Sequence, residues 1–298
     1  MLGQQILNGL VSGAIYALFA LGFNLIFGVQ KVLNLAHGGV FMSGAFIAYY
    51  AVVSGLPFWV ALLLAMLACG LISVLIDVLG FQPLRRRSHA DSEFGAIVIS
   101  IGVDLILASL AQRMSDTKVL SFPFGTFPVE FFRGWGLRIS LLQIAIVLLV
   151  ALLLAGLVLY LQRTSFGRQI RAVAINERAA ALLGVSARAV YFQTFFIAGG
   201  MAGLAGVLIG LSFNSVHFLM GEPYMLKAFV VVVLGGLGNL PGAVAASLLL
   251  GILQTMTVAY LPAGLSDTLI FSTLFVVLLF WPNGLFGGAT VPAGIGRQ

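Results

Sequence analysis

Long apolar stretches alternate with short polar ones along the whole chain. A helix needs about 20 apolar residues to cross roughly 30 Å of hydrocarbon. The pattern therefore predicts an all-α polytopic membrane protein, with about eight transmembrane helices in one transmembrane domain over residues 1–298. The predicted spans lie near residues 5–28, 36–54, 57–81, 94–113, 138–161, 190–212, 240–261 and 265–281.

One apolar segment, residues 225–234, is too short for this pattern. It lies between "GEPY" and "GGLGNLPG". We expect a short broken or re-entrant helix here, whose free backbone groups must meet protein or water. A short tilted span is the alternative.

The composition indicates a lipid environment. The chain is 61% hydrophobic and 8% charged, whereas a soluble domain is about 45–50% apolar and about 25% charged. The net charge is +6, but no basic stripe interleaved with aromatic residues suggests a nucleic-acid partner. The single cysteine, Cys69, excludes a disulfide or zinc framework.

Basic residues gather in three loops that the order of the spans places on one side. These loops contain Lys31, the arginines at 85–87 and five arginines between 163 and 188, which are nine of the fifteen basic residues. Cytoplasmic loops of membrane proteins carry an excess of Lys and Arg. We therefore expect these loops in the cytoplasm and the amino terminus in the periplasm.

The polar stretch "SFGRQIRAVAINERAAALLGV", residues 165–185, interrupts the apolar pattern. Ser165 is a candidate helix cap and Gly184 a candidate stop, which predicts a short amphipathic helix. Such a helix either lies in the lipid headgroup layer or docks into a groove of a soluble partner. Its apolar side is expected to contain Ile170, Val173, Ala174, Ala181 and Leu182, and its polar side Arg168, Arg171, Glu177 and Arg178.

This stretch resembles the cytoplasmic coupling loop of permease subunits of bacterial ABC importers for branched-chain amino acids, the LivH type. Other strings that are similar to the family occur in the expected order over nearly the whole chain. They are "YALFALGFNLIFGVQKVLNLAHGGVFMSGAF" (16–46), "FQPLRRR" (81–87) and "LKAFVVVVLGGLGNLPGAVAASLLLGI" (226–252).

The resemblance implies a multi-pass permease domain over residues 1–298 in the bacterial inner membrane, surrounded by lipid. It implies that this chain works with three kinds of partner: a second homologous permease, two cytoplasmic ATPases and a periplasmic solute-binding protein. The ATPase-coupling residues would be Arg168, Arg171, Asn176, Glu177, Arg178 and Gly184.

The chain has no phosphate-binding P-loop of its own. No G-x-x-x-x-G-K-[ST] occurs, and none of Lys31, Lys118 and Lys227 follows a glycine. We therefore expect no cofactor and no catalytic residue in this chain, with ATP and Mg bound by the partner ATPases. The protein is not expected to be an enzyme.

Polar residues in the first span suggest a translocation path. Asn8, Ser12, Tyr16 and Asn24 are spaced by four or eight, which favours one helix face. A polar stripe in lipid must face protein or water. Hydrogen bonding between helices is the alternative, at about 0.6–2 kcal/mol per contact. Our candidate path residues are Asn8, Ser12, Tyr16, Asn24, Asn34 and His37.

Asp104 lies near the middle of its span, at a position where the resemblance implies a small or uncharged polar residue. It is either structurally paired or part of a proton relay, although no second intramembrane acid or basic partner is evident from spacing. His37, His89 and His217 fall in different segments, so no metal site is predicted. Gly9/Gly13, Gly199/Gly203, Gly206/Gly210 and Gly238/Gly242 form either internal helix contacts or an interface with the second permease.

Two other functions stay open. A self-sufficient secondary transporter would couple to an ion through Asp104 and use residues 165–185 only as a membrane anchor. A related ABC permease would carry urea or short amides, because nothing in the spans excludes them. An intramembrane enzyme around His37 has no second catalytic residue nearby.

Overall fold

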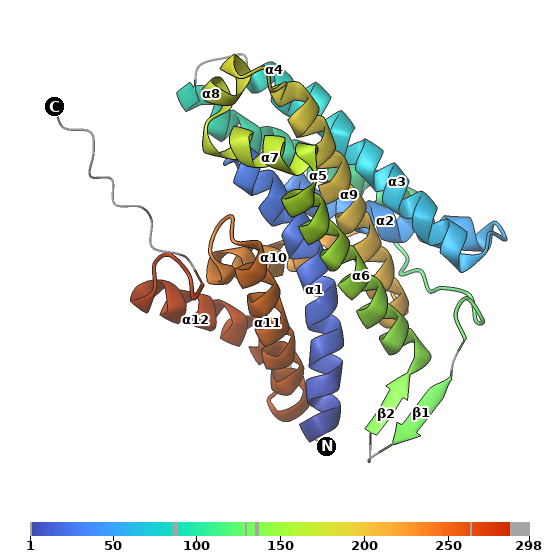
Figure 1. Cartoon of the computed structure of the whole chain (residues 1–298). Coiled ribbons are helices and arrows are strands. Elements are labelled where there is room, and N and C mark those ends of the chain that lie inside the picture. Colours follow the sequence, from blue (N-terminus) through green and yellow to red (C-terminus); the bar gives the residue numbers. More distant parts are fainter. Residues whose placement is uncertain (1, 86–88, 129, 135–136, 263, 287–298) are drawn as a thin grey trace.

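A computed structural model describes residues 2–85, 89–128, 130–134, 137–262 and 264–286 (Figure 1). The long helices are α1 (Leu2–Gln30), α2 (Ala36–Val53), α3 (Phe58–Ile76), α5 (His89–Ser115), α6 (Leu141–Arg163), α9 (Ala187–Ser212), α10 (Gly221–Gly235), α11 (Leu240–Tyr260) and α12 (Leu265–Phe280). The short elements are the π-helical turn η1 (Asp77–Phe81), α4 (Gln82–Arg85), α7 (Ser165–Ile175), α8 (Glu177–Leu182) and the strands β1 (Phe131–Gly134) and β2 (Leu137–Ser140).

The predicted all-α polytopic membrane fold is confirmed. Within the described residues, seven helical stretches are long and apolar enough to cross a membrane. The last expected span is present as α12, but its 16 residues fall short of the seven others. The basic turn is described only as far as Arg85, so Arg86 and Arg87 lie outside the described residues. The side of the membrane on which each loop lies stays a prediction.

The short element expected at 225–234 is α10, which has 15 residues and begins earlier than predicted. It packs against α1, α2, α11 and α12. Its first residue, Gly221, lies directly against the backbone of Gly38 in α2. The surrounding helices therefore enclose this short helix, which is the setting in which a truncated intramembrane helix is tolerated.

Three of the four predicted glycine pairs, Gly9/Gly13, Gly199/Gly203 and Gly206/Gly210, form contacts inside this chain, whereas a Cβ on Gly238 of the fourth pair would meet nothing within 4 Å. A Cβ on Gly13 would come within 2.8 Å of the Ser247 carbonyl oxygen in α11, and one on Gly9 within 2.6 Å of Ile252 Cα. Gly203 packs in the same way against Cys69, which joins α9 to α3. Small residues let helix backbones approach closely. These pairs are therefore used for packing α1 on α11 and α3 on α9.

The sequence pattern missed a β-hairpin before α6. The predicted span starts at 138, but residues 137–140 form β2 and pair with β1 in antiparallel register. Ser140 then caps α6, because its hydroxyl accepts from Leu142 N–H while the Gln143 side chain accepts from Ser140 N–H. This reciprocal capping box starts the helix at Leu141.

Candidate translocation and coupling sites

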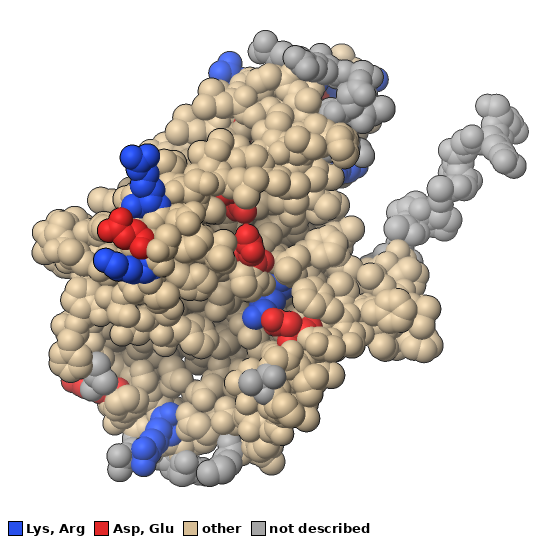
Figure 2. Space-filling model, turned by 180° about the vertical axis from the view of Figure 1, so that it is seen from behind, with Lys and Arg blue, Asp and Glu red and all other residues tan. Residues whose placement is uncertain are grey.

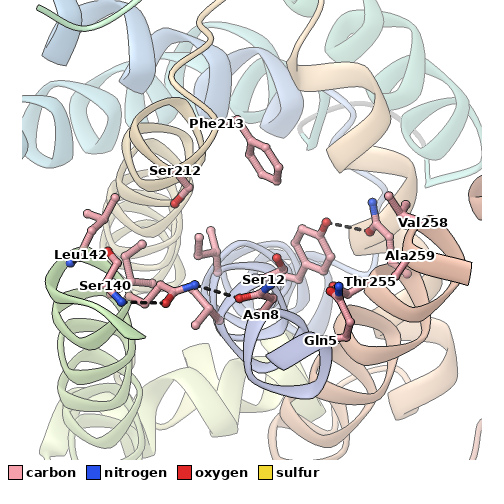
Figure 3. Close-up of a pocket in the computed structure, with 16 residues that line it drawn as sticks. Gln5, Asn8, Ser12, Ser140, Leu142, Ser212, Phe213, Thr255, Val258 and Ala259 are labelled. Carbon is pink, nitrogen blue, oxygen red and sulfur yellow. Dashed lines mark hydrogen bonds between the residues drawn. The ribbon is translucent and has the colours of Figure 1, made fainter. Parts of the chain in front are cut away.

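A cavity of about 520 Å³ opens between α1, α6, α9 and α11 (Figure 3). We call it the vestibule. It lies along the first half of α1 and the second half of α11, whereas α7 and α8 connect α6 to α9 at the other end of the bundle (Figure 1). Its lining residues are Gln5, Asn8, Val11, Ser12, Ile15, Tyr16, Ser140, Leu142, Gln143, Ile146, Ser212, Phe213, Gln254, Thr255, Val258 and Ala259.

Uncharged polar side chains from different helices bind one another across the vestibule. The Tyr16 hydroxyl donates to Gln254 Oε1 at 2.7 Å, which joins α1 to α11. Gln143 Nε2 donates to Asn8 Oδ1 at 3.0 Å, which joins α6 to α1 (Figure 3). The lining therefore offers hydroxyl and amide groups without a fixed charge.

Three of the six candidate path residues, Asn8, Ser12 and Tyr16, line this vestibule. Asn24 does not. Its Oδ1 accepts from Gly238 N–H at 2.9 Å and its Nδ2 donates to the Asn239 carbonyl at 3.3 Å. With 3.6 residues per turn, the sixteen residues from Asn8 to Asn24 rotate the side chain by about 160°. The stripe is therefore not one continuous face, and Asn24 instead holds the turn between α10 and α11.

Asn34 and His37 also lie away from the vestibule, in the packed region where α2 begins. The His37 ring is fully buried and stacks on Phe19 at 4.9 Å between ring centroids. Its Nε2 lies 3.4 Å from the Phe19 carbonyl oxygen, which favours a structural histidine. The buried Asn34 amide has no hydrogen-bond partner among the residues that the structure describes.

The predicted helix over 165–185 is wrong as one continuous element, because it breaks at Asn176. This residue is extended, with φ −156° and ψ 106°, and its side-chain oxygen accepts from Ala179 N–H at 3.0 Å. It therefore ends α7 and caps α8. Thr164, and not Ser165, caps α7 by accepting from Gly167 N–H at 3.0 Å. Gly184 has φ +83° and ends the segment as predicted.

The break changes which apolar side chains are covered. Ile170 and Val173 are buried, as the amphipathic pattern predicts. Leu182 was expected on the same side, but it is 89% exposed. Leu183 is 84% exposed and Ile175 is 81% exposed. We call Ile175, Leu182 and Leu183 the exposed ridge.

A polar network holds this segment on the helix bundle. Glu177 Oε2 accepts from the Tyr191 hydroxyl at 2.8 Å. The Arg85 guanidinium stacks over the Tyr191 ring at 4.0 Å and lies 2.8 Å from Asp77 Oδ1. Gln30 Nε2 donates to the same Asp77 oxygen at 3.1 Å. The network therefore connects α8 to α9, to α4 and η1, and to the end of α1.

The six candidate coupling residues thus divide into three kinds. Arg171 binds the Leu161 carbonyl and Glu177 binds Tyr191, so both hold the segment in place. Asn176 and Gly184 set the backbone. Arg168 and Arg178 are exposed.

Two charged residues inside the membrane pattern were missed as a pair. Lys227 in α10 lies 3.7 Å from Asp267 in α12, and its ammonium is 5.3 Å from the centre of the Tyr224 ring and 6.0 Å from that of Tyr16. The only signal in the sequence was one lysine within a short apolar run.

Asp104 lies against α2. A Cβ on Gly39 would come within 2.7 Å of Asp104 Oδ1, so the missing side chain makes room for the carboxylate. Among the described residues, no three His, Cys, Asp or Glu gather closely enough to hold a metal ion.

These features define a multi-pass membrane transport protein, with a polar vestibule at one end of the bundle and an exposed ridge at the other. Residues 5–279 match a family model described as "Branched-chain amino acid transport system / permease component". The chain belongs to this family.

Curated relatives agree with the family match. The chain is 32% identical over 297 residues to the high-affinity branched-chain amino acid transport system permease protein BraD of Pseudomonas aeruginosa, with 95% of each chain covered. It is 29% identical over 296 residues to the permease LivH of Escherichia coli strain K12, again with 95% of each covered. It is also 30% identical to LivM of the same strain, over 91% of this chain and 67% of LivM.

Proposed function

We propose that this chain is the translocating subunit of an ATP-driven importer for branched-chain amino acids in the bacterial inner membrane. A periplasmic binding protein delivers the substrate, and two cytoplasmic ATPases bind ATP and Mg. Membership of the permease family supports this function. Similarity to both LivH and LivM supports a homologous second permease as the partner within the membrane.

The exposed ridge is the observation that carries the proposal. Three large apolar side chains, each more than 80% exposed, project from a segment with charged neighbours. Large apolar side chains exposed among charged residues are typical of a protein interface. An apolar groove on an ATPase subunit would cover it, as helix-in-groove complexes do. A helix lying flat in the headgroup layer is the alternative.

The packing offers a route from the ridge to the vestibule. The Glu177–Tyr191 hydrogen bond ties α8 to the start of α9, and the Gln30–Asp77 bond ties the same network to the end of α1. The opposite ends of α1 and α9 line the vestibule through Ser12 and Ser212. A push on the ridge by closing ATPases would therefore tilt helices that border the substrate path.

A double substitution on the ridge tests this role. Leu182→Gln with Leu183→Gln should prevent the ATPases from co-purifying with the permease and reduce ATP-driven uptake by about tenfold or more, because hot-spot apolar contacts are lost. The matched control is Phe124→Gln, which changes a fully exposed aromatic residue in the loop before β1. Unchanged ATPase binding by the double variant would reject the docking role.

A further inference from the structure

The pair formed by Lys227 and Asp267 is unequally exposed. The lysine side chain is only 10% exposed, whereas the aspartate side chain is 64% exposed. Their closest atoms, Lys227 Nζ and Asp267 Oδ1, lie 3.7 Å apart, which is longer than a tight charge-assisted hydrogen bond. The pair is therefore open on the aspartate side.

This pair lies next to the vestibule. The Lys227 ammonium faces the Tyr16 and Tyr224 rings, whose centroids are 5.8 Å apart. Tyr16 also lines the vestibule and binds Gln254 there. One tyrosine thus borders both the cavity and the charged pair. Figure 2 shows a few acidic and basic side chains on a face that is mostly formed by uncharged residues.

Charged groups within a membrane protein need a partner or water, and they mark substrate or ion pathways. Two opposite charges present a positive and a negative group to a ligand at the same time. A free α-amino acid carries the complementary carboxylate and ammonium groups. The apolar side chain of such an amino acid would contact the aromatic rings of Tyr16 and Tyr224.

We propose that Lys227 and Asp267 form a binding site for the zwitterionic head of a free α-amino acid on its way through the permease. Lys227 binds the carboxylate, and the exposed carboxylate of Asp267 binds the ammonium. The inference rests on the proposed function and adds the position at which the substrate is recognised inside the membrane. Urea or an uncharged amide has no charged group to bind Lys227 or Asp267, so the site disfavours such substrates.

The experiment uses the complete importer complex in lipid nanodiscs without its binding protein, and measures L-leucine binding by saturation-transfer NMR. Asp267→Asn and Lys227→Met should each weaken leucine binding by about tenfold or more, because each leaves one charge of the ligand unpaired. Asp267→Glu, which keeps the charge, should retain binding. Lys118→Met, at an exposed lysine in the loop after α5, is the matched control.

Two analogues test the pairing itself. Leucinamide lacks the carboxylate and 4-methylpentanoate lacks the ammonium, so both should bind more weakly than leucine to the wild-type complex. Because Lys227 is buried, thermal unfolding of each variant is measured as well. Asp267→Asn keeps the proposal testable if Lys227→Met does not fold, since its side chain is mostly exposed.

ATP-driven leucine uptake by the same complex with binding protein added separates the two levels of the proposal. A wild-type complex that takes up leucine, with variants that bind leucine as tightly as wild type, would overturn the Lys227–Asp267 site and leave the importer function standing. A wild-type complex that binds leucine but does not accumulate it would overturn the importer function and keep the site. A wild-type complex that neither binds nor accumulates leucine would reject both the site and the importer function.

Discussion

The two ends of the helix bundle use polar side chains in different ways. At the vestibule, uncharged groups bind across helices, as in the Tyr16–Gln254 and Gln143–Asn8 pairs. At the end that carries α7 and α8, the Asp77–Arg85 ion pair supports a network that reaches Glu177. The vestibule lining itself carries no charge and lets a zwitterion move on from the Lys227–Asp267 pair beside it, whereas the Asp77–Arg85 pair fixes helix ends relative to each other. The difference indicates a weakly interacting cavity at one end of the bundle and rigidly connected helix ends at the other.

The largest loss of folded protein is expected where α1 packs on α11, because α1 contributes residues both to the vestibule and to the Asp77–Arg85 network. Gly13→Leu would push a side chain against the backbone of Ser247 and Leu248, which cannot move aside easily. Overpacking typically costs about 1–3 kcal/mol and occasionally more, and a collision with backbone lies at the upper end, so little folded permease should be recovered from membranes. Detergent-resistant, monodisperse protein is measured by size-exclusion chromatography.

The control for this substitution is Gly156→Leu in α6. A Cβ at Gly156 meets nothing within 4 Å, so the added side chain points into open space. This variant should behave as wild type. Equal yields from both variants would show that the close approach of α1 and α11 does not determine folding.

An intermediate effect is expected at the end that carries α7 and α8. Asp77→Ala would leave the Arg85 guanidinium without its carboxylate and remove the bond from Gln30. Breaking a buried pair on one side costs about 3 kcal/mol, the lower end of the usual range because Arg85 is one-quarter exposed. Thermal unfolding should show this loss, and ATP-driven uptake should fall with it.

Asp77→Asn serves as the milder comparison, because its amide oxygen still accepts from Gln30. It should retain more stability than Asp77→Ala. An Asp77→Ala variant that unfolds at the wild-type temperature and transports normally would contradict the view that this ion pair holds the helix ends rigidly together.

The smallest effect is expected at the vestibule. Tyr16→Phe removes the hydrogen bond to Gln254 and keeps the ring. Hydrogen bonds between membrane helices average about 0.6 kcal/mol, so stability should change by about that amount and uptake by about threefold or less. Initial uptake rates and thermal unfolding measure both. A loss as large as that of Asp77→Ala would remove the contrast between the two ends.

Apolar run lengths predicted most of the fold, because a membrane helix must be both long and apolar. The same rule misplaced the start of α6, since the β-hairpin and the capping box at Ser140 depend on local hydrogen bonds. It also missed the break at Asn176, although Asn followed by Glu is a cap signal within an otherwise helical pattern.

The candidate sites were less predictable, because they depend on contacts between distant helices. Spacing placed Asn8, Ser12 and Tyr16 together correctly, but helix rotation carried Asn24 away from them. The Lys227–Asp267 pair joins residues forty positions apart, which no local pattern reveals. The contact between Asp77 and Arg85 can be predicted from the sequence, because the two residues are about two turns apart along one helical stretch.

The central claim is that separate ATPases drive this permease through its exposed ridge. The most direct test reconstitutes the chain in liposomes, alone or with the second permease, the two ATPases, ATP and a leucine-loaded binding protein. We predict accumulation of radiolabelled leucine against its gradient only in the complete system. Concentrative uptake by this chain alone, driven by an ion gradient and abolished by Asp104→Asn, would contradict the claim and support a secondary transporter.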